Sequence, residues 1–237
     1  MRSIEKPYED ADMRINGTLS VLDACRSNNP DARIIFSSTR AVYGDSKSIP
    51  VREDFPTNPR SMYAITSLAA EKILSMYGNL YGINFTILRL VNTYGPRHQM
   101  KKAYGVLNYF VKQAVSNNPI TVMGAGGIIR DFLFVDDACN AFLECAKSPR
   151  TNGEILNLGS GIGVSFLELA NKIKSATNGT IKRIEYTKKL EQVEPGNFIA
   201  DITKIKKLIS WKPKTPLDEG IKKTIDFYKK NKKHYWQ

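Results

Sequence analysis

The sequence has few residues of the kinds that hold metals or form disulfide frameworks. It contains three cysteines, Cys25, Cys139 and Cys145, which form no CxxC pair, and only two histidines. The odd cysteine number argues against a disulfide framework, and no His, Cys and carboxylate cluster has the spacing of a metal site. We therefore predict that the chain has no metal centre.

Long apolar runs are absent as well. No stretch approaches the roughly 20 apolar residues that a transmembrane helix needs, and the opening MRSIEKPY lacks the apolar segment of a signal peptide. The 237 residues are 42% hydrophobic, which is ordinary for a folded protein with a real core. We expect one large domain or two small ones in the cytoplasm, without a membrane partner.

Positive charge is in excess, with a net charge of +12 at pH 7. Such a charge raises the question of a nucleic-acid partner. Much of it lies in Lys204–Lys207 and Lys222–Lys233, where apolar residues alternate with the lysines at helical spacing. No aromatic stacking platform is interleaved with these lysines. The pattern favours the solvated faces of two amphipathic helices, and we expect no nucleic-acid partner.

Apolar periodicity indicates that helices and strands alternate in the first part of the chain. Residues 15–27 and 63–81 have a helical period, and residues 33–38 and 84–90 have the composition of buried strands. A helix between two buried strands is typical of a parallel, doubly wound sheet. The sequence therefore predicts an α/β fold.

The pattern changes after residue 97, where we expect a smaller α/β region interwoven with the first. A capping box of Ser165 and Glu168 predicts the start of a helix that ends near Thr177. Gly124–Gly127 is expected to be a hairpin turn. The other expected elements are helices at 106–116 and 136–147 and strands at 120–123, 132–135 and 154–158.

Two hydroxyl groups are expected at one edge of the sheet. Thr39 ends an apolar strand, and Tyr63 opens a helix 24 positions later. Open parallel sheets bind ligands at the carboxyl ends of their strands, where both side chains would lie. A phenol there can take or give a proton while a threonine hydroxyl orients the reacting oxygen. The pair therefore suits proton transfer at a substrate hydroxyl.

Short motifs occur in a characteristic order along nearly the whole chain. They are Ser37-Ser-Thr-Arg-Ala-Val-Tyr-Gly44, Asn58-Pro59, Tyr63–Glu71, Arg89-Leu-Val-Asn-Thr-Tyr-Gly-Pro-Arg97, Arg130-Asp-Phe132, Asn157-Leu-Gly-Ser-Gly161, Ala200-Asp201 and Trp211-Lys-Pro213. Each is weak alone, but the ordered set resembles the NAD-dependent epimerase/dehydratases, which are extended short-chain dehydrogenases. The resemblance implies a partial Rossmann-type sheet lacking its first strands.

The resemblance also implies a division into domains. Residues 1–97 would be the C-terminal part of the dinucleotide-binding domain. Residues 98–237 would mainly bind substrate, with segments near 130–160 returning to the Rossmann sheet.

For function, the resemblance implies a nucleotide-diphosphate sugar that is oxidised at a ring carbon by bound NAD and then reduced again. Tyr63 would be the acid/base, and Thr39 would hydrogen-bond to the substrate hydroxyl. Ser37, Ser38 and Tyr63 would border the cofactor. A homodimer formed through the helices at 16–27 and 63–81 is also implied.

Asn92 and Arg130 match positions that contact the diphosphate in the family. An arginine suits a diphosphate because its fork of donors can bind two oxygens at once. Two simpler interpretations stay open. Arg130 could be a surface ion-pair partner of Asp131, and Asn92 could be a turn residue.

The residues after Thr39 bear on the type of reaction. Sugar 4,6-dehydratases of this family carry an acidic pair there, because eliminating water needs a further acid and base. Arg40 and Ala41 cannot supply that chemistry. We therefore favour an epimerase, or a keto-sugar reductase, over a dehydratase.

Two departures from the family pattern weaken this assignment. Ser67 occupies the position of the lysine that the family places four residues after its tyrosine, and Lys72 would point to a different side of the helix. No glycine-rich dinucleotide loop occurs, and Gly159-Ser-Gly161-Ile-Gly163 has the wrong spacing for one and favours a turn before a capped helix. The chain would then be a fragment or impaired form that scarcely binds NAD alone. The alternative is a catalytically inactive module that binds a sugar nucleotide or dimerises.

Overall fold

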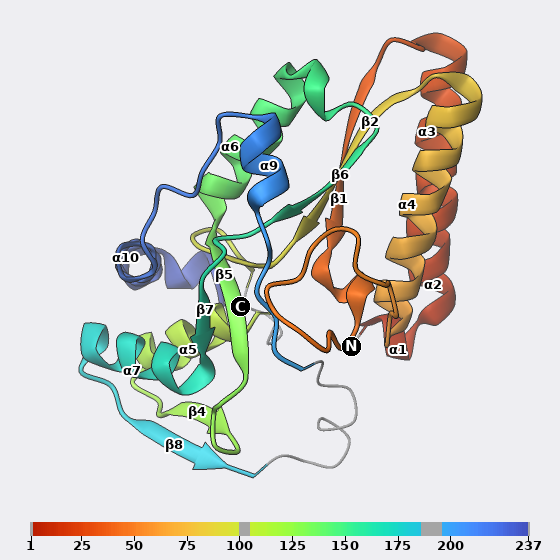
Figure 1. Ribbon diagram of the computed structural model, residues 1–237. Coiled ribbons are helices and arrows are strands. Elements are labelled where there is room, and N and C mark those ends of the chain that lie inside the picture. Colours follow the sequence, from red (N-terminus) through yellow and green to blue (C-terminus); the bar gives the residue numbers. More distant parts are fainter. Residues whose placement is uncertain (1, 100–104, 186–195, 237) are drawn as a thin grey trace. The chain divides into compact units, whose positions relative to one another are not determined.

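The computed structural model describes residues 2–99, 105–185 and 196–236 (Figure 1). They divide into two compact units, each assembled from three segments of the chain. Unit 1 comprises Met1–Leu90, Asn140–Leu158 and Ala200–Trp211, and unit 2 comprises Val91–Cys139, Gly159–Ile199 and Lys212–Gln237. None of the described helices combines the length and apolar composition that crossing a bilayer requires.

Unit 1 contains a parallel sheet with the strand order β1-β2-β6. Its strands are β1 (Arg33–Thr39), β2 (Asn84–Leu90) and β6 (Glu154–Leu158). Helix α4 (Met62–Tyr81) lies between β1 and β2 in the chain, because parallel neighbours need a long crossover connection. The predicted strand, helix and parallel strand are therefore confirmed.

Helices α3 (Gly17–Asn28) and α4 lie side by side along this sheet (Figure 1). The expected helix at 15–27 begins differently, because a π-helical turn at Asp12–Asn16 precedes α3. The short helices α1 (Arg2–Glu5) and α2 (Pro7–Ala11) also pack on α4. The core beneath these helices contains Leu22, Leu74, Tyr77, Ile83, Phe85 and Ile87.

Unit 2 contains two small sheets. The first has the order β3-β5-β7, with β3 (Asn92–Tyr94), β5 (Ile129–Phe134) and β7 (Gly163–Ser165). The second pairs β4 (Ile120–Met123) with β8 (Ile181–Ile184) in parallel. The predicted hairpin at Gly124–Gly127 is therefore wrong, because β4 and β5 belong to different sheets. β3, β7 and β8 were not predicted. β3 and β7 have three residues each, too few to show an alternating pattern, and β8 has two charged residues between its isoleucines.

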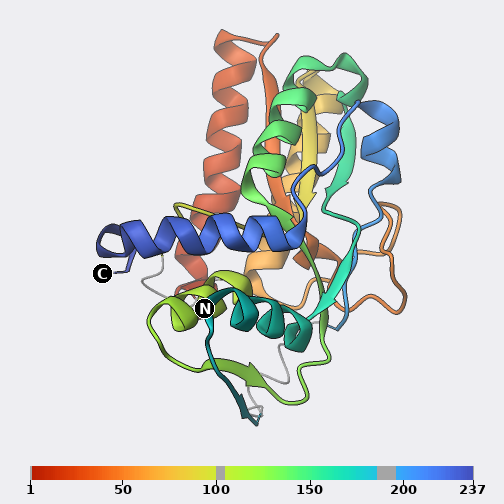
Figure 2. The ribbon, with the colours of Figure 1, turned by 90° about the vertical axis from the view of Figure 1, so that its left-hand side faces the viewer.

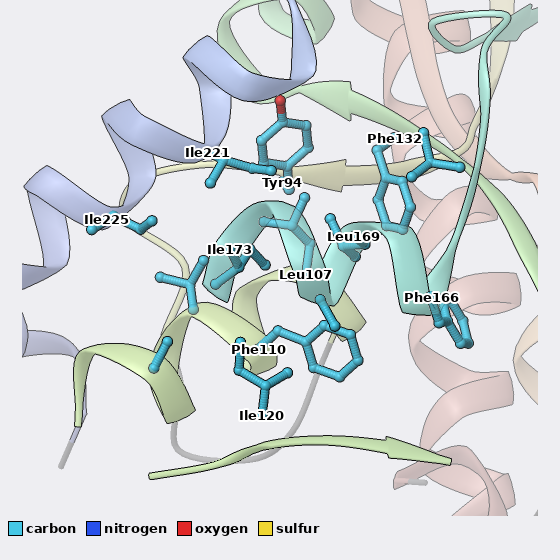
Figure 3. Packing of buried hydrophobic residues seen from close by; sticks show 14 of the residues in the cluster. Tyr94, Leu107, Phe110, Ile120, Phe132, Phe166, Leu169, Ile173, Ile221 and Ile225 are labelled. Atoms are coloured by element: carbon cyan, nitrogen blue, oxygen red, sulfur yellow. The ribbon is translucent and has the colours of Figure 1, made fainter. Parts of the chain in front are cut away.

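Three helices pack together in unit 2, namely α5 (Val106–Val115), α7 (Phe166–Thr177) and α10 (Leu217–Tyr235) (Figure 2). The Ser165 hydroxyl accepts a hydrogen bond of 3.1 Å from the Glu168 amide, which confirms the predicted N-cap of α7. The apolar faces meet in one core, part of which is formed by Tyr94, Leu107, Phe110, Phe132, Leu169, Ile173 and Ile221 (Figure 3).

The remaining elements are α6 (Val135–Lys147), a 3-10 turn at Pro149–Thr151 and α9 (Thr203–Leu208). The lysine-rich segments form α9 and α10, as predicted. Ile205, Ile221 and Ile225 are buried on these helices, whereas Lys206 and Lys222 are exposed. The lysines thus occupy the solvated faces of two amphipathic helices.

Candidate functional site

Thr39 is the last residue of β1 and lies at the carboxyl end of the parallel sheet. Its side chain is 9% exposed, and its oxygen accepts a hydrogen bond of 3.2 Å from the Ala41 amide. This bond caps the 3-10 turn Arg40–Tyr43 that follows the strand. The hydroxyl is therefore held at the edge where sheets of this type bind ligands.

Tyr63 is the second residue of α4, whose N-terminus is fixed by a side-chain cap. The Ser61 hydroxyl accepts a hydrogen bond of 3.3 Å from the Ala64 amide. The Tyr63 ring is half-buried, and the Arg14 guanidinium lies over it with Cζ 4.3 Å from the ring centroid. Within the described part of the chain no group hydrogen-bonds to the Tyr63 hydroxyl, which leaves it available to a ligand.

Ser67 lies one helical turn beyond Tyr63 and is 2% exposed. Its hydroxyl donates a hydrogen bond of 2.6 Å to the Tyr63 carbonyl oxygen, so the side chain is turned back to the helix. Lys72 is exposed, in contrast to the buried Ser67, which confirms that it points to another side of α4. Neither position thus supplies a cation at the Tyr63 ring.

The two serines expected at the cofactor differ in their surroundings. Ser37 is exposed, whereas Ser38 is buried and donates its hydroxyl proton to Glu71 on α4. Glu71 also binds Arg89 of β2 in a fully buried ion pair, with the Arg89 Nη2 atom 2.6 Å from the Glu71 Oε2 atom. The carboxylate thus ties the end of β1 to α4 and β2.

Tyr43 extends this buried network from the turn after Thr39. The Arg89 guanidinium lies 4.7 Å from the Tyr43 ring centroid, and the Tyr43 hydroxyl donates to the Asn157 Oδ1 atom at 2.7 Å. Burial raises the pKa of the Tyr43 phenol to about 12, although the Arg89 charge opposes the shift. Tyr43 therefore stays protonated at neutral pH and serves as a hydrogen-bond donor.

Sequence reasoning did not assign roles to Glu71, Arg89, Tyr43 or Asn157. A signal was present for Glu71, because Tyr63, Ser67 and Glu71 follow one another at intervals of four and share a helix face. The contact with Arg89 had no such signal, since it depends on how α4 packs against β2.

The two predicted diphosphate contacts lie in unit 2. Asn92 begins strand β3 and is half-buried, so it is a strand residue and not a turn residue. Arg130 lies on β5 and is only 1% exposed. Its Nη1 atom donates to the carbonyl oxygens of Ile129 at 2.8 Å and Gly196 at 2.7 Å. Arg130 is therefore a buried residue and not a surface residue.

Asp131 instead holds the glycine turn that resembles a dinucleotide loop. Its carboxylate accepts hydrogen bonds from the Ser160 amide at 2.8 Å, the Ser160 hydroxyl at 2.6 Å and the Gly161 amide at 3.0 Å. Because these amides are already bonded to a buried carboxylate, they do not form a free phosphate cradle. This supports the interpretation of the segment as a structural turn before α7.

The predicted residues thus fall into two groups. Thr39, Tyr63 and Ser67 belong to unit 1, where two elements bring hydroxyl groups to the carboxyl side of the sheet. Asn92 and Arg130 belong to unit 2. The first group offers acid/base chemistry, and the second offers donors of the kind that bind anionic oxygens.

Comparison with known proteins identifies relatives over nearly the whole chain. Residues 1–224 match a family described as GDP-mannose 4,6 dehydratase. The UDP-glucose 4-epimerase of Mycolicibacterium smegmatis is 32% identical over 228 residues, which cover 96% of this chain and 72% of that protein.

Solved structures give the same result for the fold. The crystal structure of Thermotoga maritima UDP-glucose 4-epimerase with UDP-glucose has a TM-score of 0.90 and 30% identity, covering 97% of this chain and 73% of that one. UDP-glucose 4-epimerase from Thermus thermophilus in complex with NAD has a TM-score of 0.85 and 28% identity, covering 96% and 73%. The match extends over both units.

Proposed function

Because the chain belongs to the NAD-dependent epimerase/dehydratase family of extended short-chain dehydrogenases, we propose that it carries the substrate-binding and acid/base residues of a nucleotide-sugar 4-epimerase. The observation that carries this proposal is the placement of Thr39 and Tyr63 at the carboxyl side of one parallel sheet. A reactive phenol and an orienting hydroxyl are the groups needed to remove a proton from a sugar hydroxyl.

In this mechanism Tyr63 accepts the proton of the sugar hydroxyl and later returns it, while Thr39 holds the hydroxyl oxygen. Bound NAD would supply the hydride-transfer chemistry at the sugar carbon. The exposed Ser37 and the Tyr63 phenol would suit its nicotinamide end, and Ser38, which is bonded to Glu71, would lie beside it. The described glycine turn does not suit its pyrophosphate, since Asp131 occupies the amides.

Unit 1 fits the C-terminal part of a dinucleotide-binding Rossmann domain, because its sheet is parallel and carries the acid/base pair. Unit 2 fits the substrate-binding region, and Arg130 and Asn92 would bind the diphosphate. The absence of an acidic pair after Thr39, where Arg40 and Ala41 stand, favours epimerisation over dehydration. A catalytically inactive module that retains only nucleotide-sugar binding is the second candidate, favoured by the uncharged Ser67.

Calorimetric titration of the chain with UDP-glucose tests the proposal. We expect binding, and Arg130→Lys should weaken it about tenfold because a lysine cannot bind two phosphate oxygens in one plane. Tyr63→Phe should leave binding nearly unchanged. Absence of binding to any nucleotide-diphosphate sugar would contradict the proposal.

Conversion of UDP-glucose to UDP-galactose with NAD present distinguishes the two candidates. For the epimerase, Tyr63→Phe and Thr39→Val abolish conversion while UDP-glucose still binds. For the inactive module, the parent chain binds UDP-glucose and converts none.

The outer faces of α3 and α4 support a homodimer, which we include in the proposal. Val21 on α3 is 55% exposed, and Ile65, Met76 and Leu80 on α4 are 47%, 45% and 65% exposed. Residues 65, 76 and 80 lie on one face of the helix because their spacing of 11 and 4 approximates whole turns. Such a face suits an isologous contact with a second copy.

A further inference from the structure

The candidate acid/base site contains a cation whose position the sequence did not indicate. The lysine position is taken by Ser67, which has no charge and donates its hydroxyl proton to the Tyr63 carbonyl oxygen at 2.6 Å. The Arg14 guanidinium, in contrast, stacks on the Tyr63 ring at 4.3 Å. A positive charge therefore reaches the phenol from the π-helical turn before α3 instead of from α4.

Arg14 is held in this position by partners on two elements. Its Nε atom lies 3.3 Å from the Asp10 Oδ1 atom, and its side chain is 30% exposed. The other carboxylate oxygen of Asp10 accepts a hydrogen bond of 2.6 Å from the Thr66 hydroxyl on α4. Asp10 thus links Arg14 to the helix turn that also carries Tyr63 and Ser67.

We propose that Arg14 supplies the positive charge at Tyr63 that the lysine position lacks. It acts as a positioning residue in the nucleotide-sugar epimerase function proposed above, on which this inference rests. A cation against the face of a phenol ring stabilises the negative charge that forms when the hydroxyl loses its proton. Arg14 also fixes the ring plane, because a planar guanidinium stacks on an aromatic face.

Other charged groups also lie on α4 and on the elements packed against it. Glu71 and Arg89 form their own ion pair. Asp23 and Arg26 contact Tyr77 and Tyr81 near the other end of α4. The elements packed against α4 also carry the exposed Glu5, Tyr8, Glu9 and Asp12, the half-buried Arg33 at the start of β1, and Arg40 and Tyr43 in the turn after Thr39.

The reactivity of Tyr63 toward an aryl sulfonyl fluoride tests the proposal in the parent chain. This reagent modifies phenolate more readily than phenol, and peptide mass spectrometry reports each tyrosine separately. We expect Arg14→Met to slow modification of Tyr63 about tenfold, as the loss of a partly exposed cation at the ring predicts. Arg14→Lys should retain most of the rate.

Two further variants separate charge from packing. Arg14→Met combined with Ser67→Lys restores a cation on α4 and should return the Tyr63 rate to within about threefold of the parent. Asp10→Asn keeps an oxygen to accept from Thr66 but turns an amide donor toward the Arg14 Nε atom, so Arg14 is no longer held on the ring and modification should become slower. This variant leaves Arg14 itself unchanged and keeps the test decisive if Arg14→Met does not fold.

A matched control exists on α3, where the Arg26 guanidinium lies 4.6 Å from the Tyr81 ring centroid and 3.5 Å from Asp23. Arg26→Met should leave the Tyr63 rate unchanged. The proposal would be overturned if folded Arg14→Met modified Tyr63 at the parent rate. It would also be overturned if the rate fell and a lysine at neither position 14 nor position 67 restored it. This assay contains no nucleotide sugar or NAD. A failure of the proposed epimerase function would instead appear in the UDP-glucose binding and conversion experiments, so the two failures can be distinguished.

Discussion

The ion pair of Glu71 and Arg89 is the residue-scale feature most sensitive to substitution. Both side chains are nearly fully buried, at 1% and 3% exposed, and Glu71 also accepts from Ser38. Removing one partner leaves the other charge buried without compensation, which costs about 3–5 kcal/mol. We therefore expect Glu71→Leu and Arg89→Met each to lower the free energy of unfolding by about that amount.

The double variant Glu71→Leu/Arg89→Met should recover most of this loss, because an apolar pair of similar volume leaves no charge unpaired. Urea unfolding of the parent, both single variants and the double variant measures the coupling. Additive losses in the double variant would show that the pair does not act as a unit. As a surface comparison, Glu219→Gln removes the exposed pair with Lys223 and should change stability by less than about 1 kcal/mol.

The positions of residues within elements could be predicted from sequence where the signal was local. Thr39 and Tyr63 were identified from a strand end and a helix start, and the structure places them at those element ends. The contacts that surround them were not predictable. Arg14 reaches Tyr63, and Asp10 reaches Thr66 across 56 positions, through the packing of separate helices that no spacing rule encodes.

At the scale of elements, two glycines with positive φ allow a direct comparison. Gly82 ends α4 with φ of 70°, and an added Cβ there would meet no atom within 4 Å. Gly44 follows the turn Arg40–Tyr43 with φ of 66°, and an added Cβ would lie 1.9 Å from the Asn58 carbonyl oxygen. The two sites also differ in ψ, because Gly82 lies in the left-handed helical region with ψ of 16°, whereas Gly44 has ψ of −131°, in a region that residues with a side chain rarely adopt.

We expect Gly82→Ala to cost about 1 kcal/mol, the strain of a left-handed residue with a side chain. Gly44→Ala should cost at least about 2 kcal/mol more, because its backbone region disfavours a side chain more strongly and the Asn58 segment must also shift. Thermal or urea unfolding of both variants measures the difference. Equal losses would contradict this expectation, because neither the backbone conformation of Gly44 nor its contact with Asn58 would then constrain the turn after Thr39.

Elements with a clear hydrophobic period were predicted well, and those defined by pairing were not. The predicted helix at 63–81 corresponds to α4, and the predicted strands at 33–38 and 84–90 correspond to β1 and β2. Each predicted end lies no more than one residue from the observed one. The error at Gly124–Gly127 arose because glycines mark a turn without indicating which strands pair. β4 pairs with β8, which lies about 60 positions away in the chain.

At the scale of the whole molecule, the apolar faces of α3 and α4 determine the expected association. If two copies meet there, each substitution acts twice in an isologous interface. We expect Leu80→Lys to weaken the dimer at least about a hundredfold, since burying a lysine in place of a leucine on each copy costs several kcal/mol. Sedimentation equilibrium of the parent and variant measures the dissociation constant.

An exposed apolar residue outside these helices provides the control. Ile162, in the turn that Asp131 holds, is 66% exposed, which is close to the 65% of Leu80. Ile162→Lys removes a similar amount of exposed apolar surface and should leave the dimer unchanged. If Leu80→Lys and Ile162→Lys lower association equally, association depends on exposed apolar surface in general. The α3 and α4 faces are then not the interface. A monomeric parent would contradict the proposed dimer.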